Sequence, residues 1–189
     1  MLRRERSSMR EIILPEAKPA LEWVRGRVLQ KVSPRRKHAL AQARFASALD
    51  AWAEANGSGT VGTEWEFRLQ PPGEIRRPLV PDVAYISFER LPFDESSATD
   101  IPPVAPDAVV EVLSPGDHQE DVDDKLRVYL ACGVLVIFLA DTKSRRVDAY
   151  DVEGVTIFQA TDPVEHPALP GFSMPASRLF EPIRPRRSS

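Results

Sequence analysis

The strongest constraint on the fold is a pair of short apolar runs joined by a helical segment. Residues Ala108–Leu113 and Val134–Ala140 are rich in β-branched and aliphatic side chains, as expected of strands buried on both faces. Between them, apolar residues including Leu126 and Tyr129 recur at helical spacing, which predicts a helix from His118 to Ala131. A strand, a helix and a strand in this order predict a right-handed parallel crossover.

The first half of the chain predicts a second helix and further strands. A stripe from His38 through Phe45 to Trp52 predicts a helix that begins near Ser33-Pro34 and ends at Asn56-Gly57. Together with the crossover, this helix indicates a mixed sheet with helices packed on it. Further strands are expected at 61–69 and 80–88, hairpins at 21–32 and 147–159, a loop at 89–106, and an extended tail after residue 159.

Length and composition fit one globular domain. The chain has 189 residues, of which 42% are hydrophobic and 28% charged. We expect a basic, partly flexible tail over 1–20, a single domain over 21–181 and a basic tail over 182–189. The formal net charge of −3 gives no overall attraction for nucleic acid, although such a sum can conceal a local basic surface. The single cysteine, Cys132, and apolar runs too short to span a bilayer favour a cytoplasmic protein with no membrane partner.

A carboxylate inside a strand of the buried type is the first candidate for chemistry. Glu111 interrupts Ala108–Leu113, and a lone buried charge is strongly unfavourable unless something pairs with it. It is a salt-bridge partner, the solvent-facing position of the strand, or a metal ligand at the strand end. Asp82, near the start of the strand expected at 80–88, is a strand-entry cap or a second ligand. Two carboxylates on one sheet would suit Mg²⁺ or Mn²⁺, which take oxygen ligands.

Lys125 has two interpretations. It shares one side of its helix with Asp121 and Tyr129, and the local pattern favours an ion pair with Asp121 worth about 0.3–0.5 kcal/mol. Alternatively, its ammonium group reaches Glu111, orients an attacking water and offsets charge on a phosphate. His38, on an apolar helix face, is a hydrogen-bonded packing residue or a member of the same site. With three histidines and one cysteine in the chain, a zinc site is not expected.

Several segments, in a fixed order along the chain, resemble those of one known family. They are Val80–Ala84, Ala105–Pro115, the helix residues Asp121, Lys125 and Tyr129, and Gly133-Val134, within a likeness that runs from about Leu21 to Phe180. In these segments the chain resembles the Uma2 family of endonucleases, in the PD-(D/E)xK restriction-endonuclease-like group. The resemblance implies an α/β fold with a mixed α+β sheet: a core of helix, three strands, helix and strand, with added hairpins.

The resemblance also implies roles for individual residues. Asp82 and Glu111 would be metal ligands, with the main-chain carbonyl of Val112 as a third. The position two residues after Glu111 is Leu113, and the lysine would come instead from the following helix as Lys125. The implied activity is Mg²⁺- or Mn²⁺-dependent hydrolysis of DNA, with Asp82, Glu111 and Lys125 as catalytic residues, by a homodimer. Further residues that could line the site are Glu22, His38, Asp121 and Tyr129.

Two departures from the family pattern keep an alternative open. Where relatives carry basic and hydroxyl residues after Ser114-Pro115, this chain has an acidic segment from Asp117 to Asp124. These acids would repel a phosphate backbone, or they form a solvated helix start where the dipole favours negative charge. The glutamate that is usual after Gly26 is Arg27 here. The alternative function is therefore a catalytically silent nuclease-like fold that binds nucleic acid or protein.

Overall fold

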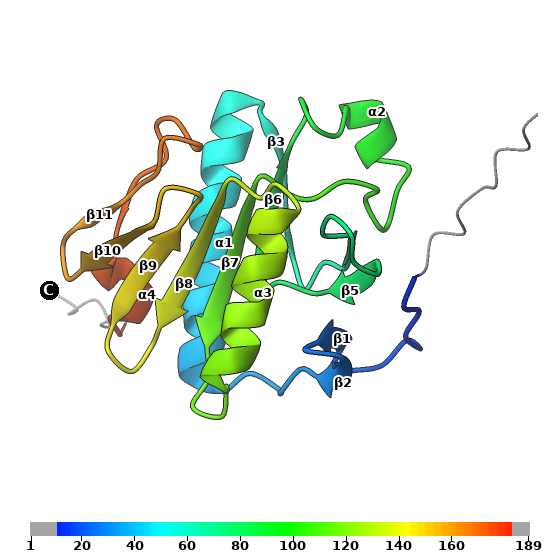
Figure 1. The fold of residues 1–189 in the computed structure, drawn as a ribbon. Coiled ribbons are helices and arrows are strands. Elements are labelled where there is room, and N and C mark those ends of the chain that lie inside the picture. The colour runs from blue at the N-terminus through cyan, green and yellow to red at the C-terminus, as the bar shows by residue number, and fades with distance from the viewer. Residues whose placement is uncertain (1–10, 183–189) are drawn as a thin grey trace, which may run out of the picture.

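A six-stranded mixed sheet forms the centre of the computed structural model, which describes residues 11–182 (Figure 1). The strands are arranged in the order β10-β9-β8-β7-β6-β3. The β7 and β8 strands run parallel, and the other neighbours in this sheet are antiparallel. The strand bounds are β3 (Gly59–Thr63), β6 (Val83–Ser87), β7 (Ala108–Leu113), β8 (Val136–Asp141), β9 (Arg146–Tyr150) and β10 (Val155–Gln159).

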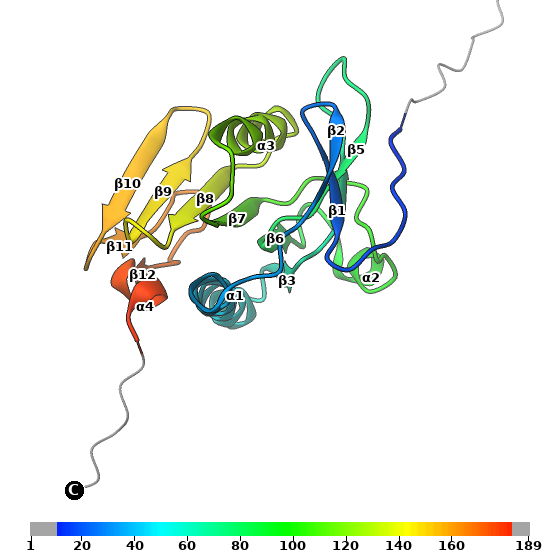
Figure 2. The ribbon, with the colours of Figure 1, turned by 90° about the horizontal axis from the view of Figure 1, so that it is seen from below.

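Helices cover both faces of this sheet. Viewed from below, α3 (Gln119–Ala131) lies on one face, and α1 (Arg36–Asn56) and the short α4 (Ser177–Phe180) lie on the other (Figure 2). The β7–α3–β8 segment is the parallel crossover that the sequence predicts. The mixed α+β fold class is therefore confirmed.

The α1 helix ends where expected but begins later. At its end, Gly57 adopts the left-handed backbone (φ 57°) and its N–H bonds to the carbonyls of Ala53 and Glu54. At its start, the expected cap at Ser33 is wrong, because Arg35 occupies the cap position without a side-chain cap bond. Before the helix, the backbone N–H of Lys31 donates to the Ala20 carbonyl (2.9 Å) and continues the first hairpin, and Arg35 itself has an extended backbone (φ −78°, ψ 163°).

The strand expected at 61–69 is wrong as one element. Glu64 has a positive φ of 50°, which turns the chain out of the sheet between β3 and β4 (Phe67–Leu69). The β4 strand pairs instead with β5 (Arg77–Leu79) as a separate two-stranded sheet. The strand expected at 80–88 is correspondingly shorter, and Asp82 lies just before β6 rather than inside it.

The flanking segments add small elements to the core. The first hairpin consists of β1 (Leu21–Val24) and β2 (Arg27–Gln30), as expected. Within the loop expected at 89–106, residues Phe93–Ser96 form the one-turn helix α2. After residue 159, the chain forms β11 (Pro163–Val164), β12 (Met174–Pro175) and α4 rather than a purely extended tail.

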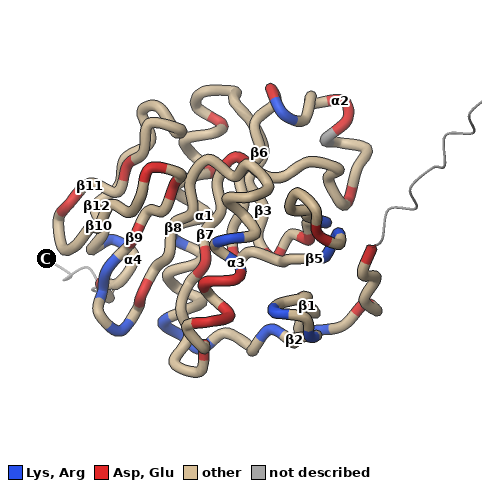
Figure 3. The backbone as a smooth tube through the Cα atoms, in the orientation of Figure 1, with Lys and Arg blue, Asp and Glu red and all other residues tan. Residues whose placement is uncertain are grey.

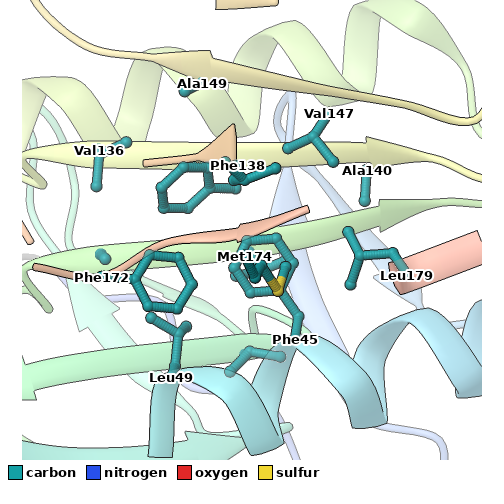
Figure 4. Packing of buried hydrophobic residues seen from close by; sticks show 14 of the residues in the cluster. Phe45, Leu49, Val136, Phe138, Ala140, Val147, Ala149, Phe172, Met174 and Leu179 are labelled. Atoms are coloured by element: carbon teal, nitrogen blue, oxygen red, sulfur yellow. The ribbon is translucent and has the colours of Figure 1, made fainter. Parts of the chain in front are cut away.

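The larger part of the core lies between the sheet, α1 and the C-terminal segment. Phe45 of α1 packs against Phe138 of β8 and Phe172, with ring centroids 5.2 and 6.2 Å apart (Figure 4). Leu169, Phe172 and Met174 are buried, so the C-terminal segment is part of this core. A second cluster, which includes Leu126 and Tyr129 of α3, covers the opposite face of the sheet.

The two expected tails are described only in part. Glu11 and Ile12 lie beside the β4–β5 sheet, where the N–H of Ile12 donates to the carbonyl of Arg76 (2.8 Å). The basic N-terminal residues up to Arg10, and the arginines from Arg184 onward, lie outside the described residues. Within residues 11–182, no helix combines the length and the apolar character needed to cross a membrane.

Candidate active site

A recess of about 310 Å³ opens at the carboxyl end of β7. The β1–β2 hairpin, the start of α1, the loop after β7 and the start of α3 form its walls. Its apolar surface comes from side chains such as Leu29 and Leu126. The charged or titratable side chains of its lining include those of Glu22, Lys31, His38, Asp82, Glu111 and Lys125.

Glu111 enters the recess because β7 alternates between the two faces of the sheet. Val110 and Val112 point into the core beneath α1, so Glu111 faces α3. There the Tyr129 hydroxyl donates to Glu111 Oε1 (2.8 Å), and Lys125 Nζ lies 2.6 Å from the same oxygen. The carboxylate is therefore partly buried, with a counter-charge and a hydrogen bond.

Lys125 does not form the local ion pair that its helix spacing favours. Its Nζ lies 3.1 Å from Glu22 Oε1 in β1 and 2.6 Å from Glu111. Asp121, the local alternative, pairs with Arg27 of the hairpin at 2.5 Å. Lys125 therefore joins β1, β7 and α3 at one point.

Asp82 forms the other half of the site. Its Oδ1 accepts a hydrogen bond from Lys31 Nζ (2.7 Å), and its Oδ2 accepts one from the backbone N–H of Val112 (2.7 Å). His38 Nε2 lies 3.3 Å from Oδ2. The bond to Val112 fixes the Asp82 carboxylate against β7, the strand that carries Glu111.

Lys31 is a charged residue of the recess that the sequence analysis did not assign to the site. It follows β2 directly, and its Nζ bonds to the Val80 carbonyl (2.8 Å) as well as to Asp82. Its sequence neighbourhood is that of an ordinary polar hairpin end. Because Lys125 is already paired with Glu111, a second cation was needed to neutralise Asp82, and this requirement could have pointed to Lys31.

His38 connects α1 to the loop after β7. Its Nδ1 lies 3.0 Å from Ser114 Oγ, while its Nε2 faces Asp82. The structure thus brings His38 into the recess, although it is not among the buried core residues of α1, which are Ala41, Phe45, Leu49 and Ala53.

The two carboxyl groups have opposite electrostatic surroundings. Burial raises the pKa of Glu111 to about 7 despite the nearby charge of Lys125. Burial alone would also raise the pKa of Asp82, but the His38 hydrogen bond and the charge of Lys31 hold it well below its usual value. Burial opposes the charge of Lys125, yet Glu111 and Glu22 raise the pKa of this ammonium above its usual value. At neutral pH Asp82 is therefore ionised, whereas burial favours the neutral form of Glu111.

The acidic start of α3 is partly neutralised by the first hairpin. Arg27 pairs with Asp121, and Arg25 pairs with Glu120. The backbone N–H of Arg25 also donates to Asp124 Oδ2 (2.9 Å). The two departures from the family pattern, Arg27 and the acidic segment, therefore contact each other.

The oxygen atoms of the recess are the donors that could hold a cation. Across residues 11–182, no set of three or more His, Cys, Asp or Glu side chains is arranged to hold a metal ion. Asp82 and Glu111 supply two carboxylates beside the backbone of Val112. Carboxylate and main-chain oxygens are the ligands that Mg²⁺ and Mn²⁺ accept.

The mixed sheet, with a recess at the end of its parallel pair, defines a mixed α+β protein. The structure is similar to a crystal structure described as "a putative nuclease belonging to DUF820" from Anabaena variabilis ATCC 29413. The two chains have 26% sequence identity and a TM-score of 0.78, over 88% of this chain and 93% of the other.

The family is settled by sequence. The model of the Uma2 family, described as "Putative restriction endonuclease", matches residues 10–177, and the chain therefore belongs to the Uma2 family. The resemblance seen in the sequence is confirmed. A search of curated proteins finds no match.

Proposed function

We propose that this chain is a Mg²⁺- or Mn²⁺-dependent endonuclease that hydrolyses phosphodiester bonds of DNA. The family and the Anabaena neighbour support a nuclease-like function. The observation that carries the finer proposal is the meeting of Asp82, Glu111 and Lys125 in one recess, where Lys125 Nζ lies 2.6 Å from Glu111.

Asp82, Glu111 and the main-chain carbonyl of Val112 would hold the ion. The N–H and C=O of one strand residue point toward the same neighbour, and the N–H of Val112 points at Asp82 Oδ2. This geometry supports a carbonyl directed to the Asp82 side of β7. When bound, a divalent ion supplies Lewis-acid stabilisation of negative charge on a phosphoryl oxygen.

The side chains of the recess would prepare the reaction. Lys125 carries its positive charge where a phosphate would enter, and its ammonium protons can orient a water and stabilise developing negative charge. Tyr129 holds the Glu111 carboxylate through its hydroxyl, which fixes the position of the ligand oxygens. Glu22 would likewise fix the position of Lys125, and His38 would fix that of Asp82.

The alternative of a catalytically silent fold loses one of its supports. The acidic start of α3 would repel DNA if its charges were free, but Arg25 and Arg27 offset two of them, those of Glu120 and Asp121. We also propose that the protein is a homodimer, since a two-fold pair of sites suits cleavage of both strands. Light scattering of the purified chain tests this stoichiometry.

The central experiment is cleavage of supercoiled plasmid DNA with Mg²⁺, with Mn²⁺ and with EDTA. Wild type should cut with either ion and not with EDTA. The Glu111→Gln and Lys125→Ala variants should each lower the rate by about a hundredfold or more, because each removes a group that acts on the transition state.

A matched control is Glu89→Gln, which removes an exposed carboxylate that follows β6, away from the recess. It should cut at the wild-type rate. Equal cutting by wild type, Glu111→Gln and Lys125→Ala would reject the assigned site. No cutting by wild type with any ion would favour the silent-fold alternative.

A further inference from the structure

We propose that two basic segments flanking the recess bind the phosphate backbone of DNA. These segments are Arg35–Lys37 at the start of α1 and Lys143 with Arg145 in the turn between β8 and β9; together we call them the basic edge. The inference rests on the proposed function, because it assigns how the substrate of that same site is held.

The topology brings both segments to the end of the sheet where the recess lies. β8 runs parallel to β7 with Leu113 opposite Asp141, so the turn after β8 leaves the sheet beside the loop after β7. On the other side, His38 contacts Ser114 of that loop, and Arg35–Lys37 directly precede His38. Figure 3 shows the basic residues of both segments along the lower edge of the molecule.

The basic residues at the start of α1 lie where the helix dipole is unfavourable for positive charge. The positive end of the helix dipole disfavours cations in the first turn, where acids are preferred. Here the first turn has no acidic residue, and Arg35, Arg36 and Lys37 are exposed. Within the described part of the chain, these three side chains form no ion pair. An approaching polyanion would remove this unfavourable interaction.

The β8–β9 turn likewise exposes basic side chains. Arg145 has a φ of 59°, a left-handed conformation that is unfavourable for a side chain with a Cβ. Lys143 and Arg145 are exposed, and among residues 11–182 their side chains have no acidic partner. Their neighbour Arg146, in contrast, pairs with Asp148. The two unpaired cations are therefore available for a ligand.

The surrounding charges favour DNA over a small anion. The net charge of the chain is −3, so the basic edge is a local feature of an otherwise acidic molecule. It extends on both sides of the recess, which matches a continuous line of phosphates passing the candidate active site. The arginines of the hairpin pair with two of the acids of α3, Glu120 and Asp121, which reduces the negative charge beside the recess.

The test is binding of a labelled DNA duplex by the full chain in EDTA, measured by fluorescence anisotropy over a series of salt concentrations. The double variant Lys143→Gln/Arg145→Gln and the triple variant Arg35→Gln/Arg36→Gln/Lys37→Gln should each lower the affinity by about tenfold or more at low salt. The slope of log affinity against log salt should fall by about 0.9 for each phosphate that the variant no longer neutralises.

The matched control is Arg68→Gln/Arg127→Gln, which removes two positive charges from β4 and α3 away from the basic edge. It should leave affinity and salt slope unchanged, and thermal melts confirm that all variants are folded. The inference is overturned if wild type does not bind, if both edge variants bind like wild type, or if the control is weakened as much as the edge variants.

The binding test is independent of cleavage. Edge-dependent binding without metal-dependent cutting would support the basic edge and reject the proposed function. If the protein cuts DNA but the variants of the basic edge bind it as wild type does, only the inference about the basic edge is rejected.

Discussion

Lys31 and Asp82 lie 51 positions apart in the chain, yet Lys31 Nζ and Asp82 Oδ1 are 2.7 Å apart in the recess. Lys125 and Glu111 form a second such contact at 2.6 Å. Each carboxylate proposed as a metal ligand thus has its own lysine. In this arrangement, the positive charge that an ion would bring is supplied by the protein itself.

Replacing Lys31 with methionine should destabilise the metal-free protein by about 3 kcal/mol, because it leaves the buried Asp82 carboxylate without its counter-charge. Mn²⁺ should raise the melting temperature of Lys31→Met by more than that of wild type. Differential scanning fluorimetry with and without Mn²⁺ measures both effects. Lys18→Met, an exposed change, is the control, and equal melting of wild type and Lys31→Met would contradict the prediction.

Lys125→Met should cost about 3–5 kcal/mol, because Glu111 and Glu22 would share a buried site without a cation. Adding Glu111→Gln should recover part of this loss, since one of the two carboxylates becomes neutral. Urea unfolding of the two single variants and the double variant gives the coupling energy. Simple additivity of the two changes would show that the side chains do not interact in solution.

The raised pKa of Glu111 predicts the direction in which the stability of the protein changes with pH. A carboxyl group whose pKa rises from 4.5 to about 7 on folding stabilises the protein below pH 4.5, and this contribution is lost as pH rises through 7. The full shift corresponds to roughly 3 kcal/mol. Glu111→Gln should therefore be more stable than wild type at pH 8, with the difference vanishing near pH 4.5.

Unfolding curves at several pH values test this prediction. A variant that is less stable than wild type at pH 8 would show that Lys125 and Tyr129 more than offset the burial of the Glu111 charge. Glu89→Gln, with its exposed carboxylate, should show no such pH dependence.

Gly59→Ala should disrupt the edge of the main sheet. A Cβ at this position would lie 2.2 Å from the Ile86 carbonyl oxygen and 2.8 Å from Ser87 Cα, both backbone atoms of β6. The β3–β6 pairing would have to shift, at a cost of about 1–3 kcal/mol. Gly116→Ala, where an added Cβ meets nothing within 4 Å, is the control and should melt as wild type.

Arg27→Gln should weaken the attachment of the hairpin to α3. The pair with Asp121 is partly exposed, so the expected loss is about 0.5–1 kcal/mol, and it should shrink in high salt. Hydrogen exchange of the β1–β2 amides reports this local opening. Exchange that is unchanged at low salt would contradict the prediction.

The elements predicted correctly from sequence are those fixed by local pattern. The strand Ala108–Leu113 matches β7, and Gly57 ends α1, because residue periodicity and a left-handed cap are properties of a few neighbouring residues. The split at Glu64 was missed because a positive φ in a non-glycine residue leaves no local signal. The start of α1 was misplaced because Arg35, rather than Ser33, has the extended cap conformation, and no side-chain cap bond marks that position.

Some residues of the candidate site could likewise be predicted from the sequence, and others could not. The sequence predicted that Asp82, Glu111 and Lys125 share one site, and the structure brings them to one recess, while their catalytic roles stay predictions. Helix spacing alone favoured Asp121 as the partner of Lys125, and two buried carboxylates override that local preference. Lys31 could not be identified, because its role arises from a contact between distant segments.

The contact between Arg27 and Asp121 also has an evolutionary consequence. These residues are 94 positions apart, and Arg27 stands where relatives usually have a glutamate. Because they form one ion pair, we expect the hairpin position and the helix position to change together among relatives, with the signs exchanged in some lineages. A chimera that inherited the hairpin from one lineage and the helix from another would bring like charges together at the mouth of the recess.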